Sequence, residues 1–552
     1  MHFNLADCFE CVADTVPERV AIVAGDQRLS YSTLDERSAR FANALADAGI
    51  RRGEHVGLYL HNQVEHLEAM LGCFKRRAVP INVNYRYGPD ELAYLFADAE
   101  IGALVYGAEY REIVDALRPL LPKLRVVIEV GDGDAPPGAL DYEGALGSAS
   151  TTRTFAPRSA DDHYVLYTGG TTGMPKGVVW RQEDMFFATL GGGNPGGTPI
   201  ERPEEIAQTV LVNRSQRLTP FLSPGDPVPE QFVVLALGPL MHASGQWSAL
   251  GALLAGATVV IYTERSIDME HVLALVERER VVMLTLVGDA SARPLLEARE
   301  ANPSRDDTSS LQLLGSGGAI LSADVKERLL AAFPSVLAIT EAIGASESPV
   351  QAVAVTRRDG APQESLRFDP RDTTMVVDDE LRPVARGSGA IGRLATRGRV
   401  PLGYYRDEEK SASTFVDIDG VRWALPGDMA TVDADGSIHL LGRGSMCINT
   451  GGEKVYPEEV EAVVKAHPGI ADAIVVGAPD ERFGQRVVVV AAAHDPLAPP
   501  TLDEIRAHCR SRLAGYKLPR SLLIVDHVER SPAGKPDYRW AVVVAGSLPA
   551  ES

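Results

Sequence analysis

The chain has 552 residues, of which 45% are hydrophobic and 23% charged, a composition typical of a globular protein rather than a disordered one. Its length exceeds that of one ordinary hydrophobic core, so at least two domains are expected. The formal net charge of -21 at pH 7, with no long basic run, argues against nucleic acid or an anionic membrane surface as a partner.

The N-terminal sequence MHFNLADCFE lacks a basic start followed by an apolar segment, so secretion is not expected. Five scattered cysteines favour reduced thiols in the cytoplasm. Cys8 and Cys11 have C-x-x-C spacing, but no second pair completes a metal site, and a structural role is favoured. The most apolar stretch, from Gln231 to Tyr262, is interrupted by polar residues and glycines, which indicates a buried strand, helix and strand rather than a transmembrane helix.

Strand patterns alternate with helix patterns along most of the chain. EHVGLYL is followed by NQVEHLEAMLGCFKRRA, and ATVVIY by DMEHVLALVERER, as in the β-α units of layered parallel sheets. The Gly/Pro-rich stretch that begins at Gly191 is expected to be a surface insertion. After residues 442 to 445, alternating helix and strand patterns predict a compact α+β unit of about 110 residues. The predicted fold class is therefore α/β with a smaller α+β unit at the C-terminus.

The loop YTGGTTGMPKGV, from Tyr167 to Val178, combines glycines, threonines and Lys176. Glycines let backbone N–H groups approach a ligand, and hydroxyl and ammonium groups add donors, which suits the phosphates of a nucleoside triphosphate. It is not a Walker A loop, because Pro175 rather than Gly precedes the lysine. Both flanks are rich in β-formers, so the loop is expected to join two strands. On its own the stretch would equally suit a mobile surface loop.

Four more motifs follow. They are GSGGAI from Gly315, IGASES from Ile343, a long segment that carries Asp428 and Arg443, and ERSPAGKPDYRW with Lys535. In this order, and over residues from about 30 to 540, the chain resembles the adenylate-forming superfamily of acyl-CoA synthetases, peptide-synthetase adenylation domains and beetle luciferases. The resemblance implies a large N-terminal domain (1–442), a hinge (443–446) and a small mobile C-terminal domain (447–552) that carries the catalytic lysine, with the active site between the two domains.

Enzymes of this superfamily convert a carboxylate and ATP into an acyl-adenylate, whose AMP is a good leaving group, and many then transfer the acyl group to CoA. The first step brings anions together, so hydrogen-bond donors and Mg²⁺ are needed to offset their repulsion. By resemblance, the β- and γ-phosphates are held by Thr168, Gly169, Gly170, Thr171, Thr172 and Lys176. Ser346 matches the hydroxyl that contacts the α-phosphate, and Glu347 the carboxylate that holds Mg²⁺; Thr168, Glu347 and Lys535 form the expected catalytic set.

The resemblance also assigns the nucleoside. Asp428 matches the acid that accepts hydrogen bonds from the ribose hydroxyls, and Arg443 a basic residue beside the ribose, whereas Asp428 alone could equally be the structural partner of an arginine. Lys535 matches the lysine that contacts the substrate carboxylate and the α-phosphate, although a lone lysine is ordinarily a solvated side chain.

The backbone strip beside the adenine corresponds to Gly317, Gly318 and Ala319, continued by Ile343, Gly344 and Ala345. Ile343 stands where relatives have an aromatic residue, so a stacking contribution on the order of 1 kcal/mol is lost. Glu341 stands where many relatives have Asn; its carboxylate is expected to accept the adenine amino group, and a plain surface acid is an equally good alternative.

Positions in the hinge and the other substrate sites are also implied by resemblance. Ser445 is the pivot, Asn449 replaces a lysine of some relatives, and the CoA pantetheine is expected to pass Gly451, Gly452 and Glu453. The acyl pocket is expected to be bordered by His242, Gly245, Gly288 and Asp289.

A closer resemblance, through VNYRYGPDELAYLF, INTGGEKVYPEEVE and ERSPAGKPDYRW, is to actinobacterial acyl-CoA synthetases of lipid and steroid side-chain breakdown. It implies ATP, Mg²⁺ and CoA as cofactors or co-substrates, and a long-chain fatty acid or a steroid side-chain carboxylate as substrate. Two alternatives stay open: an acyl-AMP ligase that loads a carrier protein, and a nucleotide-binding protein without catalysis. The oligomeric state is also open, with a homodimer as one option.

Overall fold

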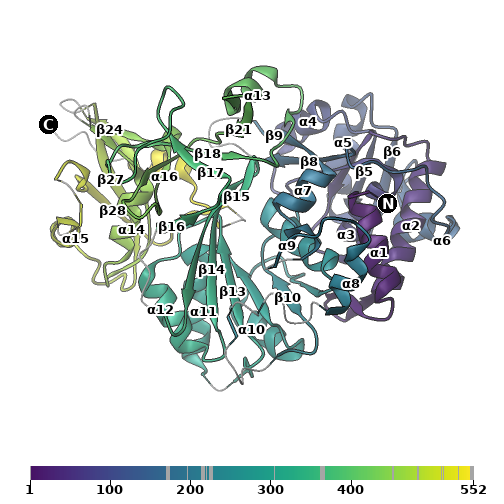
Figure 1. Ribbon diagram of the computed structural model, residues 1–552, viewed down its shortest axis with the longest axis horizontal. Coiled ribbons are helices and arrows are strands. Elements are labelled where there is room, and N and C mark those ends of the chain that lie inside the picture. Colours follow the sequence, from purple (N-terminus) through teal and green to yellow (C-terminus); the bar gives the residue numbers. More distant parts are fainter. Residues whose placement is uncertain are drawn as a thin grey trace.

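The computed structural model describes residues 2–546 except 169–173, 195–196, 213–217, 219–220, 223–227, 304, 361–366, 451–452, 481–483, 511, 514 and 532–533, and excludes the side chains of residues 212, 443, 445, 449, 453, 454 and 484. Three sheets organise these residues, and helices cover their faces (Figure 1). Among the described residues, no helix combines the length and apolar character that crossing a bilayer requires.

The first sheet has eight described strands in the order β19-β9-β8-β4-β3-β5-β6-β7. These strands are β3 (His55–Tyr59), β4 (Val79–Asn82), β5 (Ala103–Gly107), β6 (Val126–Val130), β7 (Leu140–Asp141), β8 (His163–Thr168), β9 (Lys176–Arg181) and β19 (Gly403–Tyr404). Strands β3 to β8 pair in parallel, whereas β9 and β19 are added antiparallel. The predicted unit of strand and helix after residue 55 is confirmed, since α3 (Val64–Arg76) connects the parallel strands β3 and β4.

The second sheet has fifteen described strands, fourteen of them in the order β2-β1-β11-β10-β12-β13-β14-β15-β16-β23-β22-β18-β21-β20, with β17 on β18. Its first part is β1 (Val20–Ala24), β2 (Gln27–Ser30), β10 (Val233–Ala236), β11 (Thr258–Ile261), β12 (Met283–Leu286), β13 (Leu313–Gly317) and β14 (Ala338–Ala345). Its second part is β15 (Ser348–Arg357), β16 (Arg367–Pro370), β17 (Thr374–Val377), β18 (Gly392–Arg397), β20 (Phe415–Ile418), β21 (Val421–Ala424), β22 (Asp428–Val432) and β23 (Ile438–Arg443). Pairing is parallel from β1 through β11, β10, β12 and β13 to β14, and antiparallel from β14 onward.

The third sheet is smaller and lies on the opposite side of strands β13 to β18 from the first sheet (Figure 1). It consists of β24 (Ile448–Thr450), β25 (Glu453–Val455), β26 (Ile470–Asp480), β27 (Gly484–Ala493) and β28 (Ser521–Val525). Ile448, Val460 and Val489 belong to a buried core of its own. The change of sheet falls between β23 and β24, where η4 (Gly444–Met446) connects them.

The helices of the large N-terminal part are α1 (Leu5–Thr15), α2 (Tyr31–Asp47), α3 (Val64–Arg76), α4 (Pro89–Asp98), α5 (Arg111–Leu117), α6 (Tyr142–Ser148), α7 (Gln182–Ala188), α8 (Glu205–Val212), α9 (Ala243–Leu254), α10 (Met269–Arg278), α11 (Gly288–Ala301), α12 (Ala323–Ala332) and α13 (Glu408–Thr414). Those of the C-terminal part are α14 (Pro457–Lys465), α15 (Leu502–Arg510) and α16 (Tyr538–Ala545). Short 3₁₀ turns are η1 (Ala108–Tyr110), η2 (Arg118–Leu120), η3 (Gly191–Gly193) and η5 (Gly515–Lys517).

Two sequence expectations can be compared directly with these elements. The apolar stretch after residue 231 is β10, α9 and β11, as predicted. The expected surface insertion at Gly191 is wrong at its start: Gly192 and Gly193 are buried, and a Cβ on either would lie within 3.1 Å of Phe187 or Phe186.

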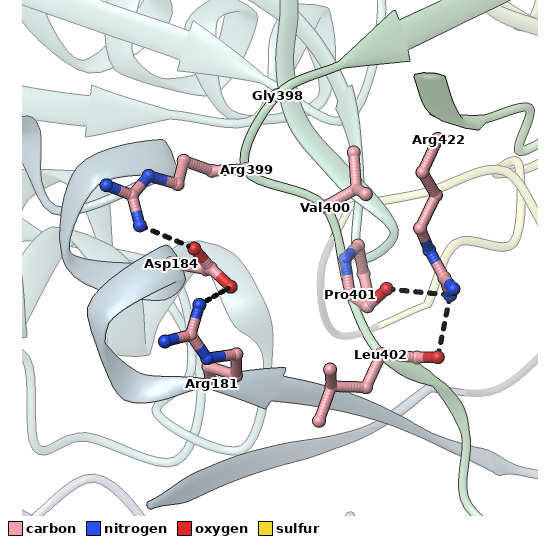
Figure 2. A pocket seen from close by; sticks show the side chains of 8 residues that line it. All are labelled: Arg181, Asp184, Gly398, Arg399, Val400, Pro401, Leu402 and Arg422. Atoms are coloured by element: carbon pink, nitrogen blue, oxygen red, sulfur yellow. Dashed lines mark hydrogen bonds and ion pairs between the residues drawn. The ribbon is translucent and has the colours of Figure 1, made fainter. Parts of the chain in front are cut away.

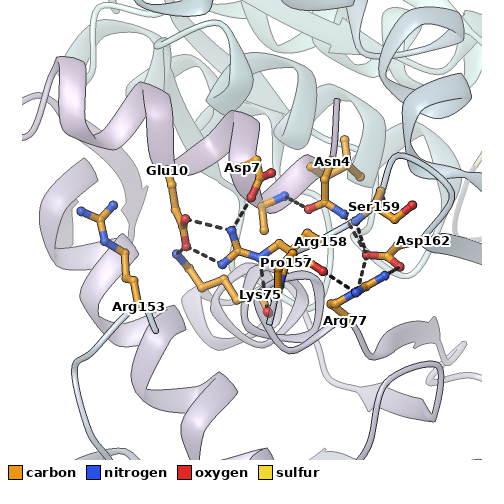
Figure 3. Close-up of polar contacts among 12 residues, drawn as sticks. Asn4, Asp7, Glu10, Lys75, Arg77, Arg153, Pro157, Arg158, Ser159 and Asp162 are labelled. Carbon is orange, nitrogen blue, oxygen red and sulfur yellow. Dashed lines mark hydrogen bonds and ion pairs between the residues drawn. The ribbon is translucent and has the colours of Figure 1, made fainter. Parts of the chain in front are cut away.

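A polar network ties α1 to α3 and to the segment before β8 (Figure 3). Arg158 donates to Glu10 at 2.8 and 2.9 Å, and the buried Lys75 donates to the same carboxylate at 2.6 Å. Arg77 Nε and Nη2 donate to the two carboxylate oxygens of Asp162 at distances from 2.7 to 3.1 Å. Because buried charges are stable only when paired, these contacts fix where β8 enters the first sheet.

Candidate active site

The Gly/Thr loop leaves β8 and enters β9, as predicted from its β-rich flanks. Thr168 is the last residue of β8 and stands opposite Lys176, the first residue of β9, in an antiparallel pair. The Lys176 ammonium forms an ion pair with Asp407, and this hydrogen bond lowers the pKa of the Asp407 carboxyl. Gly169, Gly170, Thr171 and Thr172 lie outside the described residues.

Ser346 and Glu347 form the turn between β14 and β15, flanked by the Ala345–Ser348 pair. The Ser346 carbonyl accepts a hydrogen bond from Trp180 Nε1 at 3.1 Å, and Glu347 Oε1 accepts one from the Tyr404 hydroxyl at 2.5 Å. Trp180 lies on β9 and Tyr404 on β19. The fold therefore brings the predicted α-phosphate residue beside β9, the strand into which the Gly/Thr loop leads, and the predicted metal residue beside β19, which pairs with β9.

Asp428 and Arg443 are opposite each other at the ends of β22 and β23. Asp428 has 7% of its surface exposed, and the Arg443 side chain lies outside the described residues. The register brings the two predicted ribose residues together, but it fits a structural acid–arginine pair equally well.

Lys535 reaches from the C-terminal part into the N-terminal part. Its Cε lies 3.7 Å from the place that a Cβ on Gly318 would take, directly after β13. Gly534 is closer still to the large domain, because a Cβ there would lie 2.9 Å from Val287 Cγ1 and 3.4 Å from Ala290 Cβ. Lys535 is exposed to solvent. Its side chain nevertheless lies beside Gly318, in the predicted adenine strip.

His242 is the residue before α9 and lies close to Lys535. Burial, with the added effect of the Lys535 and Arg86 charges, lowers the pKa of His242 to about 4. The ring is therefore neutral near pH 7. Gly245 lets the helix start approach the preceding loop, since a Cβ there would lie 2.3 Å from the Pro239 carbonyl oxygen.

Gly288 and Asp289 are hydrogen-bonded to residues on either side of the predicted adenine strip. Gly288 N donates to Ser316 Oγ at 3.1 Å, and Asp289 N donates to the Ile320 carbonyl at 2.8 Å. The Asp289 carboxylate accepts from the Ser322 N–H at 2.8 Å and the Ser322 hydroxyl at 2.5 Å. This carboxylate is thus engaged in holding the strip, and its place beside an acyl pocket stays a prediction.

Glu341 and Ile343 lie on the same face of β14, because side chains alternate along a strand. Glu341 is 8% exposed and pairs with Lys326 of α12 at 2.9 Å; burial raises the pKa of its carboxyl despite that lysine. The surface-acid alternative is therefore wrong. Ile343 is 7% exposed and packs in a core cluster with Phe368 and Ile438, so little of its side chain is left to contact a purine.

Lys326 was not identified from the sequence, although a signal exists. It lies between Val325 and Leu329, and all three are buried residues of α12. A lysine on the apolar stripe of a helix predicts a buried acidic partner.

The residues of the proposed second half-reaction are less completely described. Ser445 lies in η4, and Glu453 begins β25 opposite Thr450; the side chains of both, and all of Gly451 and Gly452, lie outside the described residues. Gly442 has φ +117°, a backbone conformation that favours glycine, and the Glu458 carboxylate of α14 lies 2.0 Å from the place that a Cβ would take.

A pocket of about 540 Å³ lies beside β19 and β21, and Figure 2 shows its lining. Arg399 donates to Asp184 at 2.8 Å, and Arg422 donates to the Leu402 carbonyl at 2.7 Å. No predicted site residue lines it. The lining therefore does not connect this pocket with the predicted nucleotide site.

Comparison with known proteins identifies the family of the chain. Residues 9–405 match the family described as AMP-binding enzyme, and residues 459–535 match the AMP-binding enzyme C-terminal domain. The chain is 43% identical to the medium/long-chain-fatty-acid–CoA/3-oxocholest-4-en-26-oate–CoA ligase of Mycolicibacterium smegmatis, with 100% of this chain and 98% of the relative covered. It is 41% identical to the 3-oxocholest-4-en-26-oate–CoA ligase of Rhodococcus rhodochrous, with 100% and 97% covered.

A solved structure has the same fold over its whole length. The anthranilate CoA ligase AuaEII in complex with anthranoyl-AMP superimposes with a TM-score of 0.83 at 24% identity, covering 99% of both chains. The chain therefore has the adenylate-forming fold and belongs to the family of AMP-binding enzymes, with both the N-terminal and the C-terminal part of that family present.

Proposed function

We propose that the chain is an ATP-dependent, AMP-forming carboxylic acid:CoA ligase that activates a bulky hydrophobic acid, either a long-chain fatty acid or a steroid side-chain carboxylate. The observation that carries the proposal is the position of Lys535, with Cε 3.7 Å from a Cβ site on Gly318 although the two residues are far apart in sequence. The relatives support the substrate class, since they are named as ligases of medium- and long-chain fatty acids and of 3-oxocholest-4-en-26-oate.

In the first half-reaction the acid carboxylate attacks the α-phosphate of ATP, and pyrophosphate leaves. Thr168 and Lys176, with the loop residues between them, hold the β- and γ-phosphates. Lys535 brings its ammonium to the carboxylate and to the α-phosphate, where it offsets the charge repulsion between two anions. Such stabilisation is stronger in a cleft with little water than in bulk solvent.

Mg²⁺ fits the site through Glu347. The Tyr404 hydroxyl, 2.5 Å from Glu347 Oε1, fixes the orientation of this carboxylate. Magnesium in phosphate sites commonly takes one or two protein carboxylates and fills its other positions with phosphate oxygens and water. When bound, the ion would supply further positive charge beside the phosphates.

The nucleoside is assigned to strands β13, β14 and β22. The backbone of Gly317, Gly318 and Ala319 lies along the adenine, Glu341 accepts its amino group, and Asp428 accepts from the ribose hydroxyls with Arg443 beside it. The buried Lys326 supports this part of the proposal, because its charge keeps Glu341 closer to the ionised form that can accept.

In the second half-reaction the CoA thiol attacks the acyl carbonyl and AMP leaves. The proposal places Ser445 at the pivot of the C-terminal domain (447–552), and Gly451, Gly452 and Glu453 along the pantetheine. The neutral His242 and the apolar residues of α9 border the acyl pocket, as an uncharged wall suits a hydrophobic substrate. Cytoplasmic localisation belongs to the proposal and is supported by five cysteines without disulfides.

The test is formation of AMP and thioester by the purified protein with ATP, Mg²⁺, CoA and acids from acetate to a C27 steroid acid. A bulky acid should give both products, and Lys535→Ala should abolish them, whereas Lys123→Ala, which removes an exposed lysine paired with Glu100, should not. Adenylate without thioester would instead favour a carrier protein as acceptor. No turnover with any acid would favour a nucleotide-binding protein without catalysis.

A further inference from the structure

Lys535 follows Gly534 in a short turn whose described residues are hydrogen-bonded to one another. Ser531 N donates to the Lys535 carbonyl and Gly534 N to the Ser531 carbonyl, both at 2.8 Å. Lys535 N donates to Ser531 Oγ at 3.2 Å, and Arg530 forms an antiparallel bridge with Pro536. These bonds close the turn on itself, but none of them connects it to the sheet of the C-terminal part.

Arg530 provides that connection. Its Nε and Nη2 donate to the two carboxylate oxygens of Asp472 at 2.7 and 2.6 Å. Its remaining nitrogen, Nη1, donates to the Gly534 carbonyl at 3.0 Å, next to Lys535. One guanidinium therefore joins β26, which carries Asp472, to the peptide bond that precedes the predicted catalytic lysine.

The surroundings make this connection rigid. The Arg530 side chain is 11% exposed and that of Asp472 is 24% exposed, and Lys465 approaches Asp472 at 3.3 Å. Burial alone would raise the pKa of Asp472, but Lys465 and Arg530 outweigh it and hold this pKa at about 2. Bidentate arginine–carboxylate pairs in such settings fix geometry as well as charge.

The turn is also one of the places where the C-terminal part contacts the large part. Gly534 comes so close to Val287 and Ala290 that a Cβ would not fit without displacement. Asp289, between these two residues, is near enough to contribute to the field on Arg530. A small shift of the turn would consequently move the Lys535 ammonium along the adenine strip.

We infer that Arg530 and Asp472 are positioning residues for Lys535 and act in the adenylation half-reaction only. The inference rests on the proposed function, in which Lys535 contacts the α-phosphate. Arg530 does not touch substrate; it holds the Gly534 carbonyl, and thereby the lysine, in register with Gly318. Its loss should lower the rate of adenylate formation and leave the transfer from a preformed adenylate to CoA unaffected.

The experiment measures the two half-reactions separately. Acid-dependent ATP–pyrophosphate exchange reports adenylation, and thioester formation from added acyl-adenylate reports transfer. For Arg530→Gln we expect a fall of about 10²-fold in the exchange rate at saturating ATP, since a displacement near 1 Å can cost that much. Transfer should stay within about twofold of the wild type, and Lys535→Ala/Arg530→Gln should be within about twofold of Lys535→Ala.

Arg77→Gln is the matched control. Arg77 likewise has an 11% exposed side chain, pairs with an aspartate, Asp162, and donates to a backbone carbonyl, that of Pro157. It directly follows α3, which lies far from the C-terminal part that carries Lys535 (Figure 1). It should lower the melting temperature to a similar extent without a selective loss of exchange. Asp472→Asn is the second variant if Arg530→Gln does not fold, and it should show the same selective loss.

Equal losses in both half-reactions, or a full additional loss in the double variant, would overturn the inference. If Lys535→Ala itself left exchange unchanged, the assignment of Lys535 in the proposed function would fail, whatever the result for Arg530.

Discussion

The buried ion pair between Lys326 and Glu341 gives a quantitative prediction about stability and nucleotide binding. Their Nζ and Oε2 atoms are 2.9 Å apart, and the side chains are 2% and 9% exposed. At an effective dielectric constant of about 20, the attraction is roughly 6 kcal/mol. Desolvation of both ions offsets most of this, but removal of one partner leaves a buried charge and costs about 3–5 kcal/mol.

The perturbation is Lys326→Met, with Glu341→Leu and the double variant to complete a cycle. We expect Lys326→Met to lower the free energy of unfolding by about 3–5 kcal/mol at pH 7 and the double variant to recover about 2 kcal/mol of it. Urea denaturation at pH 7 measures both. Arg328→Met on the same helix, whose partner Glu300 is 48% exposed, is the control and should cost about 1 kcal/mol or less.

The same variant should weaken ATP binding. Without Lys326, the already raised pKa of Glu341 rises further, and a protonated carboxyl accepts the adenine amino group less well. A cost below about 1 kcal/mol for Lys326→Met, or strict additivity in the double variant, would refute the argument that this pair is a coupled buried unit.

Two further outcomes are expected. Gly534→Ala, at φ +69° and with its Cβ 2.9 Å from Val287 Cγ1, should disfavour the docked turn by about 2–4 kcal/mol and lower acid-dependent pyrophosphate exchange; an unchanged exchange rate would contradict this. Burial lowers the pKa of His66 to about 4, while the unfolded chain binds that proton at about 6.5. The free energy of unfolding should therefore fall as pH drops from about 6.5 to 4, by at most about 3 kcal/mol for this residue. His66→Leu should flatten the pH dependence in that window, measured by urea denaturation at several pH values, and equal slopes for both proteins would count against it.

Much of the fold could be predicted because local patterns specify it. The β-rich flanks of the Gly/Thr loop predicted two strands, and β8 and β9 are those strands. Contacts between distant segments could not be predicted in this way. Tyr404, which holds Glu347, stands in a short edge strand that no periodicity marks, and Trp180 reaches Ser346 from another sheet.

The predicted nucleotide site shows the same division. The family motifs predicted Asp428, Arg443 and Lys535 as site residues, but the burial of Ile343 follows from packing of β14 against neighbouring strands and has no counterpart in the motif itself. Arg530 falls inside the Lys535 motif, yet its partner Asp472 is 58 residues away. Only the fold shows that the two side chains meet.

The most direct test of the central claim is acid-dependent ATP–pyrophosphate exchange by the purified protein, with and without Lys535→Ala. If the C-terminal lysine acts on the α-phosphate, a long-chain or steroid acid will support exchange in the wild type, and the variant will lose about 10²-fold or more. Exchange that is independent of the added acid, or unchanged in Lys535→Ala, would contradict adenylation by this site.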